Sequence, residues 1–200
     1  MGGRAQQTKK PAPCIILDRD GVINHDSDDY IKSPNEWQPI AGSLEAIARL
    51  TKANIKVLVA TNQSGIARGL YDEGTLAKIH AKMTRLIVEK GGQLGGIFYC
   101  PHGPDDGCNC RKPLPGLVHQ ISDKLAIDPT NVPFVGDSVR DLVAAEAAGC
   151  QPILVKTGKG ERSLASGKVG KHITVFNDLA SFVDYWLTTM KNAENTNAAK

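Results

Sequence analysis

Two aspartates stand two residues apart in the segment Asp18-Arg19-Asp20-Gly21, directly after the apolar run Cys14 to Leu17. If the backbone stays extended, both carboxylates can face one crevice, and Gly21 permits a tight turn after them. Paired carboxylates bind a hard cation such as Mg²⁺, or they divide the work between a nucleophile and an acid/base. The alternative is a strand-end turn in which the aspartates cap backbone amides.

Uncharged polar side chains follow a second apolar run. The strand-like segment Ile55 to Ala60 leads directly into Thr61-Asn62-Gln63-Ser64-Gly65. Hydroxyl and amide groups suit phosphate oxygens, together with the backbone amides of a following helix N-terminus. Taken alone, the segment fits an ordinary helix cap equally well.

A further carboxylate follows the apolar run Val132 to Val135, in Gly136-Asp137-Ser138-Val139-Arg140-Asp141. Asp137 can reach the same crevice as the first two aspartates, and Asp141 would lie behind it or cap the next helix. Three carboxylates near one point repel each other strongly unless a cation neutralises them. The pattern therefore predicts a bound divalent metal.

Adjacent cations are supplied by Arg111-Lys112-Pro113. A lysine is a compact point charge that suits a transferring phosphoryl group, and an arginine can grip a second oxyanion with two hydrogen bonds. The alternative is a pair of basic side chains in solvent.

Four metal-binding side chains precede this pair within eleven positions: Cys100, His102, Cys108 and Cys110. Such a set suits tetrahedral Zn²⁺, and because four protein ligands leave no open position, we expect a structural site. A catalytic cysteine and an accidental cluster are the alternatives. A loop pinned by a metal would hold Arg111 and Lys112 rigidly over the crevice. Cys14 and Cys150 flank apolar runs and are expected in the core.

Alternating elements must position these residues. The apolar patterns predict strands at 14–17, 55–60, 97–99, 132–135, 151–155 and 173–176, and helices at 43–50, 72–90, 117–125, 141–148 and 178–187. Ser43 is the expected N-cap of the first of these helices. This order predicts an α/β fold with a Rossmann-like parallel sheet and helices on both faces. Ligands of such sheets bind beyond the carboxyl ends of the strands, where the polar segments after the first, second and fourth strands converge.

The motifs occur in the order D-R-D-G-V, T-N-Q-S-G, R-K-P and V-G-D-S-x-x-D. This order resembles the haloacid dehalogenase-like (HAD-like) phosphatases, over about residues 14–155. The resemblance implies that Asp18 attacks phosphorus to form an aspartyl-phosphate, and that Asp20 protonates the leaving oxygen and then deprotonates the hydrolytic water. Thr61 and Lys112 would hold the phosphoryl oxygens. Mg²⁺ would be bound by Asp18, the backbone carbonyl of Asp20 and Asp137.

The intervals between these motifs leave no room for a cap domain of about 50 residues, the usual minimum size. We therefore expect a capless form with an open crevice and a zinc-binding loop. The segments N-H-D-S-D-D-Y, Y-C-P-H, C-N-C-R-K-P and V-K-T-G-K-G are similar to the phosphatases that remove the 7-phosphate of D-glycero-D-manno-heptose 1,7-bisphosphate in lipopolysaccharide core biosynthesis. Histidinol-phosphate phosphatases, or phosphatases of another small sugar phosphate, are the alternative. The implied substrate-binding residues are Asp26, Tyr30, Asn62, Gln63, Ser64 and Arg111.

The net charge of +3 on 200 residues is confined to the two ends of the chain. Residues 1–10 carry +3 and residues 191–200 carry +1, which leaves −1 on residues 11–190. We expect one domain at 11–190 between two disordered tails. A neutral body with 5% aromatic residues disfavours a zinc-stabilised nucleic-acid-binding module, such as a polynucleotide 3′-phosphatase-like domain.

The expected partner is a small phosphorylated sugar rather than a nucleic acid or a membrane, and the expected state is a monomer. The sequence contains no run of 18 apolar residues, so we expect no transmembrane helix. The N-terminus lacks the apolar segment of a secretory signal. With five cysteines and no export signal, the reducing cytoplasm is the expected compartment.

Overall fold

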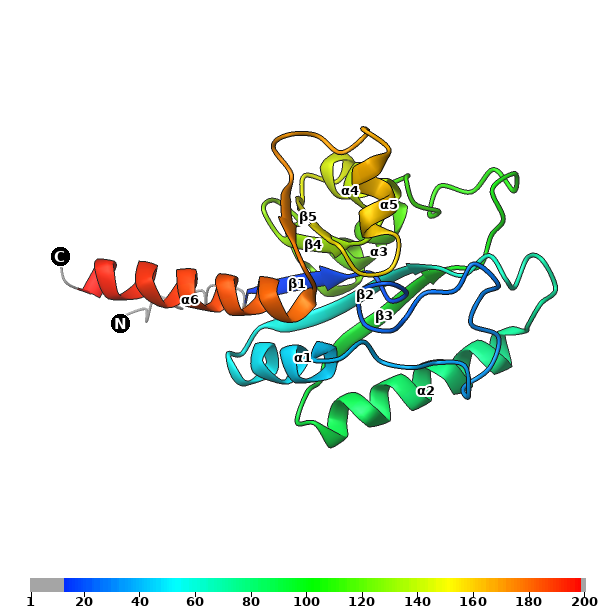
Figure 1. Ribbon diagram of the computed structural model, residues 1–200, viewed down its shortest axis with the longest axis horizontal. Helices are drawn as coiled ribbons and strands as arrows, with labels where there is room; N and C mark the ends of the chain where they lie inside the picture. Colours follow the sequence, from blue (N-terminus) through cyan, green and yellow to red (C-terminus); the bar gives the residue numbers. More distant parts are fainter. Residues whose placement is uncertain (1–12, 199–200) are drawn as a thin grey trace, which may run out of the picture.

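Six parallel strands form one sheet in the order β3-β2-β1-β4-β5-β6 (Figure 1). The computed structural model describes residues 13–198. The strands are β1 (Cys14–Leu17), β2 (Lys56–Asn62), β3 (Leu94–Cys100), β4 (Pro133–Gly136), β5 (Gln151–Val155) and β6 (Thr174–Phe176). The helices are α1 (Ser43–Lys52), α2 (Glu73–Glu89), α3 (Gly116–Leu125), α4 (Val139–Ala147), α5 (Gly160–Ala165) and α6 (Leu179–Ala198).

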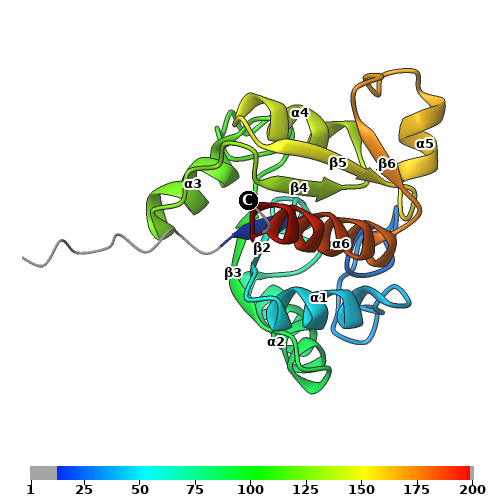
Figure 2. The same ribbon diagram turned by 90° about the vertical axis from the view of Figure 1, so that its left-hand side faces the viewer.

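Both faces of the sheet are covered by helices, because successive side chains of a strand point to opposite faces. Ile15 and Leu17 belong to a core with apolar residues of α1, α2 and α6. Cys14 and Ile16 point the other way, into a core with residues of α3 and α4. Figures 1 and 2 show the sheet between these two layers. The predicted α/β fold with helices on both faces is confirmed.

The strand order reverses between β1 and β4. From β1 the chain adds β2 and β3 on one side of the sheet, and it then adds β4, β5 and β6 on the other side of β1. Leu17 at the end of β1 is level with Val59 of β2 and Val135 of β4. The residues that follow these three positions therefore meet at one edge of the sheet. The crevice at such a reversal is the usual ligand site of open parallel sheets.

The connections at this edge contain no cap domain within residues 13–198, as expected. Only α1 lies between β1 and β2, and only α2 between β2 and β3. No helix in the described part of the chain is long and apolar enough to cross a membrane.

All six predicted strands are present, but three local features differ from the expectation. β3 begins at Leu94, three residues before its predicted start. The sequence missed these residues because Gly95 and Gly96 interrupt the apolar pattern. The short helix α5 follows a glycine-rich turn and was not predicted. Ser43, the expected cap of α1, is its first helical residue; Gly42 precedes it with a φ of 80°, and the Ser43 hydroxyl donates to the Ile23 carbonyl at 2.6 Å.

Helix α6 continues to Ala198, beyond the expected domain boundary at residue 190. It runs away from the edge that carries the polar loops (Figure 1). The expected tail at residues 1–10 lies outside the described residues, and the domain boundaries stay predictions.

Candidate active site

A cleft of about 310 Å³ opens at the carboxyl edge of the sheet. It is lined by every residue that the sequence proposed for phosphate, substrate or magnesium: Asp18, Asp20, Asp26, Tyr30, Thr61, Asn62, Gln63, Ser64, Arg111, Lys112 and Asp137. Residues from five separate segments of the chain thus share one cleft, as the convergence of strand ends predicted.

Lys112 lies at the centre of the cleft floor and is only 2% exposed. Its ammonium nitrogen is 2.8 Å from Asp18 Oδ2 and 2.6 Å from Asp141 Oδ1, and it donates to the Ala60 carbonyl at 2.9 Å. The Asn62 amide contacts the Lys112 backbone twice, since its Nδ2 donates to the carbonyl and its Oδ1 accepts from the N–H. Strand β2 therefore holds both the backbone and the charge of Lys112.

Three buried carboxylates surround one point beside this lysine. Oxygens of Asp18, Asp137 and Asp141 all lie within 4.8 Å of one another. Burial, together with the neighbouring negative charges, raises the pKa of Asp137 to about 8 and the pKa of Asp18 to about 7. Burial also favours the neutral form of Asp141, but the charge of Lys112 holds the pKa of this carboxyl below its usual value. One ammonium against three carboxylates leaves two negative charges, which fits a divalent cation bound through oxygen.

Asp20 lies outside this group, although it is only two residues from Asp18. Its carboxylate accepts hydrogen bonds from Arg19, Asn24 and Gln63. Burial opposes ionisation, but Arg19 and these hydrogen bonds hold the pKa of Asp20 below its usual value. The two aspartates of the first motif therefore have different electrostatic surroundings.

Two glycines enclose the Asp137 carboxylate. A Cβ atom on Gly21 would lie 2.0 Å from Asp137 Oδ2, and one on Gly158 would lie 2.2 Å from it. Both glycines also have positive φ values, of 81° and 57°. The Lys159 N–H donates to the same oxygen at 2.7 Å, so the segment V-K-T-G-K-G shapes the pocket around Asp137.

The cleft also contains residues to which the sequence assigned no place in the site: Asp28, Arg68, Tyr71, Ser138, Arg140 and Lys159. Lys159 follows β5, and its ammonium contacts Asp26 Oδ2 at 2.7 Å. The rule that ligands gather beyond strand ends could have found it. Arg68 stacks over the Tyr30 ring at 5.9 Å, a contact that no local pattern predicts.

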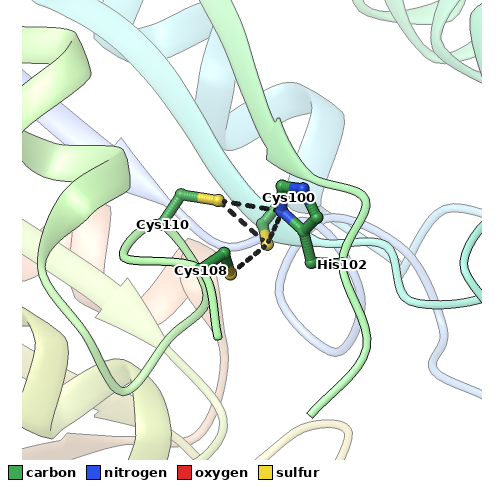
Figure 3. A group of neighbouring side chains, drawn as sticks. All are labelled: Cys100, His102, Cys108 and Cys110. Atoms are coloured by element: carbon green, nitrogen blue, oxygen red, sulfur yellow. Dashed lines mark hydrogen bonds between the residues drawn. The ribbon is translucent and has the colours of Figure 1, made fainter. Parts of the chain in front are cut away.

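Cys100, His102, Cys108 and Cys110 point toward one another from the end of β3 and the loop that follows it (Figure 3). Cys100 Sγ lies 3.7 Å from Cys108 Sγ, 3.2 Å from Cys110 Sγ and 3.6 Å from His102 Nδ1. Ligands of a tetrahedral zinc ion are separated by roughly 3.7 Å, given a Zn–S bond of about 2.3 Å. The four side chains can therefore hold one metal ion without rearrangement.

The same loop turns back toward the cleft. Asp106 accepts a hydrogen bond from the Gly103 N–H at 2.7 Å, and the Arg111 guanidinium donates to the His102 carbonyl at 3.1 Å. The Cys–His cluster thus adjoins one wall of the cleft. Burial raises the pKa of the Cys100 thiol to about 12, so its ionisation calls for a nearby positive charge.

Comparisons with known proteins agree with this geometry. The family model described as HAD-hydrolase-like matches residues 109–182. The D-glycero-beta-D-manno-heptose-1,7-bisphosphate 7-phosphatase of Pseudomonas aeruginosa is 58% identical over 167 residues, covering 84% of this chain and 93% of its own length. The protein of that name from Bordetella bronchiseptica is 56% identical and covers 86% of this chain and 97% of its own length.

Solved structures show the same likeness. The D,D-heptose 1,7-bisphosphate phosphatase of B. bronchiseptica, complexed with magnesium and phosphate, superposes with a TM-score of 0.87 at 54% identity, covering 88% of this chain and 99% of that one. The chain belongs to the HAD-like phosphatases, and within them to the family of the heptose-1,7-bisphosphate 7-phosphatases. It is therefore a phosphomonoester hydrolase.

Replacing Cys108 by alanine should remove the bound metal of the Cys–His cluster and destabilise the protein. We expect metal content to fall by one equivalent and Tm to drop by about 4 °C or more, equivalent to at least about 2 kcal/mol for a chain of this size. Elemental analysis and thermal unfolding measure the two effects. The matched control is Asp105→Ala in the same loop, where the side chain is exposed. Full metal content in Cys108→Ala would refute the assignment of this ligand.

Proposed function

We propose that this chain hydrolyses the 7-phosphate of D-glycero-β-D-manno-heptose 1,7-bisphosphate. The observation that carries the proposal is the meeting of Asp18, Thr61, Lys112 and Asp137 in one cleft, in a chain 58% identical to a phosphatase of that name. The β anomer comes from the names of the relatives. The activity would serve the synthesis of lipopolysaccharide core or nucleotide-activated heptose.

The chemistry assigned to the first motif has two steps. In the first, an oxygen of Asp18 forms a bond to phosphorus while the bond to the sugar oxygen breaks, and Asp20 gives its proton to that leaving oxygen. In the second, Asp20 takes a proton from water, the water oxygen bonds to phosphorus, and the acyl-phosphate bond breaks to restore the Asp18 carboxylate. The sum is a phosphate ester of the sugar plus water giving the free sugar hydroxyl plus inorganic phosphate.

The remaining residues position the phosphoryl group. Lys112 and the Thr61 hydroxyl would hold its oxygens, and Asn62 keeps Lys112 in place through two backbone hydrogen bonds. Gln63 donates to both Thr61 and Asp20, which makes it a link between phosphate binding and proton transfer. Charge neutralisation and positioning supply most of the rate in phosphoryl transfer.

Mg²⁺ is the cation that we assign to the three carboxylates. Asp18, Asp137 and the backbone carbonyl of Asp20 would hold it, and a related structure contains magnesium and phosphate. When bound, it would neutralise charge on the carboxylates and on the phosphoryl group. For the Cys–His cluster we propose Zn²⁺ in a structural site, since three thiols and one imidazole are typical zinc ligands.

The two walls of the cleft differ in charge, and this difference suggests how the bisphosphate lies. On one side, Asp26 and Asp28 pair with Lys159, leaving carboxylates for sugar hydroxyls. On the other side, an adjoining pocket has a lining that includes Arg111, Lys112 and Arg140 but no carboxylate. We assign the phosphate that is not hydrolysed to Arg111 and Arg140, and the sugar to the loop from Asp26 to Tyr30.

The wider setting follows from the same features. We propose that the protein acts as a monomer in the cytoplasm, where thiols stay reduced and a Cys–His site can keep its metal. The near-neutral net charge of residues 11–190 gives nucleic acids and membranes little overall electrostatic attraction, and the substrate is the expected partner.

The substrate assignment is tested by phosphate release from a panel of compounds with Mg²⁺ present or removed by chelation. We expect the heptose bisphosphate to give the highest kcat/KM, well above histidinol phosphate and single sugar phosphates, and chelation to abolish turnover. Faster hydrolysis of histidinol phosphate would instead assign the chain to the histidinol-phosphate enzymes.

Asp18→Asn should abolish turnover while the fold and the Cys–His metal remain, because an amide of equal size is no nucleophile. We expect kcat to fall by about 10⁴-fold or more, the scale of losing a catalytic nucleophile. The assay is phosphate release together with metal content and circular dichroism. Asp123→Asn on the exposed face of α3 is the control. Near-normal activity of Asp18→Asn would exclude the aspartyl-phosphate route.

Arg140→Gln should weaken recognition of the second phosphate without harming the chemistry. Hydrogen bonds to charged groups contribute about 1.5–3 kcal/mol, so we expect kcat/KM for the bisphosphate to fall about 10- to 100-fold. Activity on p-nitrophenyl phosphate, which has no second phosphate, should change less than about twofold on the same argument. Arg85→Gln, on the far end of α2, is the control. An equal loss on both substrates would argue against this orientation.

A further inference from the structure

Asp20 is held in the cleft by donors only. Its Oδ1 accepts from Arg19 Nε at 3.1 Å, Arg19 Nη2 at 2.9 Å and Asn24 Nδ2 at 2.8 Å. Its Oδ2 accepts from Arg19 Nη2 at 2.8 Å and Gln63 Nε2 at 3.0 Å. A carboxylate offers about four lone-pair directions, so these contacts use its whole capacity. The direction of this carboxylate is therefore set mainly by its principal donor, the guanidinium of Arg19.

Arg19 is itself buried, with only 1% of its side chain exposed. Nε and Nη2 face Asp20, and Nη1 faces His80 Nε2 at 3.3 Å. Because arginine carries donors and no acceptor, His80 must accept through Nε2, which requires the neutral ring with its proton on Nδ1. Burial, with the charge of Arg19 adding to it, lowers the pKa of His80 to about 4, so the neutral form persists at physiological pH.

His80 comes from α2, an element that supplies no residue to the phosphate site. It is half-buried, and its ring packs edge-on against Tyr99 at 6.0 Å between centroids. Removing its acceptor would leave a buried N–H of Arg19 unpaired, which carries the desolvation cost of that group. That cost is large enough to favour another orientation of the guanidinium, and the Asp20 carboxylate would turn with it.

We propose that His80 is a positioning residue for proton transfer, which acts on Asp20 through Arg19. The inference rests on the proposed function, since it assumes that Asp20 gives its proton to the leaving oxygen and later takes one from water. The chain His80–Arg19–Asp20 fixes where the Asp20 carboxyl group lies, both when it gives its proton to the leaving oxygen and when it takes one from water. Gln63 also positions the Asp20 carboxylate, because its Nε2 donates to Asp20 Oδ2 while its side-chain carbonyl accepts from the Tyr71 hydroxyl at 2.7 Å.

The test compares two leaving groups in His80→Leu. A sugar alkoxide needs a proton as it departs, whereas p-nitrophenolate is stable without one. Because kcat/KM covers only the steps up to departure of the leaving group, it isolates Asp20 in its acid role. General acid catalysis contributes about 10²–10⁴-fold, and we expect His80→Leu to lose about 10-fold in kcat/KM on the heptose bisphosphate and less than about twofold on p-nitrophenyl phosphate.

His80→Gln keeps an acceptor at this position of the helix, and it should restore kcat/KM on the bisphosphate to within about twofold of the parent. His119→Leu, on the exposed side of α3, is the matched control for loss of a histidine. Thermal unfolding is measured for each variant. An equal loss on both substrates, no loss on either, or failure of a folded His80→Gln to restore activity would overturn the proposal.

The outcomes also separate this proposal from the substrate assignment. If the parent protein does not hydrolyse the heptose bisphosphate, the substrate assignment fails. The comparison of leaving groups is then made with whichever alkyl phosphate the parent does hydrolyse. If the parent hydrolyses the bisphosphate and His80→Leu slows both leaving groups alike, only the positioning role of His80 fails.

Discussion

An excess of buried negative charge is the constraint on which this structure depends. Asp18, Asp137 and Asp141 share one point, and Lys112 supplies the only cation in direct contact with them among the described side chains. Desolvation of such a group is costly unless opposite charge is brought to it. The raised pKa values of Asp18 and Asp137 express that cost, and a divalent cation is the natural complement. The folded cleft is thus built for a metal and a phosphate, whose charges balance each other.

Much of the surrounding architecture keeps Lys112 at this point. Asn62 of β2 hydrogen-bonds the Lys112 backbone, and the Ala60 carbonyl accepts a hydrogen bond from the Lys112 ammonium. Arg111, the preceding residue, donates to the His102 carbonyl in the loop of the Cys–His cluster. A short surface loop has little apolar area with which to fix its own conformation. In the proposed zinc site, four ligands on one ion would replace that missing core, which accounts for a Cys–His cluster that ends two residues before Lys112.

The sequence predicted the sheet from local patterns, and local patterns together with the family resemblance named residues that the structure places along one cleft. Short apolar runs mark the buried strands, and polar residues after β1, β2 and β4 must meet at one edge. Contacts across the fold were harder to foresee. Asp141 looked like a helix cap, and it does accept from Ser138, yet its other oxygen meets Lys112 from a loop 29 positions earlier. Asn62 was expected at the substrate, but its amide holds the Lys112 backbone, a pairing that depends on how β2 and that loop approach.

The absence of a cap in the described chain changes what must provide selectivity. In an open cleft, substrate is not enclosed by a second domain, so recognition comes from the charges that the loops present. Here two regions differ: ion pairs of Asp26 and Asp28 with Lys159 and Arg162 line one, and Arg111 and Arg140, without a carboxylate, line the other. A molecule with one phosphate at Asp18, hydroxyls in the middle and a second phosphate at its far end complements all three regions. A molecule that carries an amine in place of the second phosphate would meet repulsion from Arg111 and Arg140, and on the proposed orientation we expect this repulsion to favour the bisphosphate over histidinol phosphate.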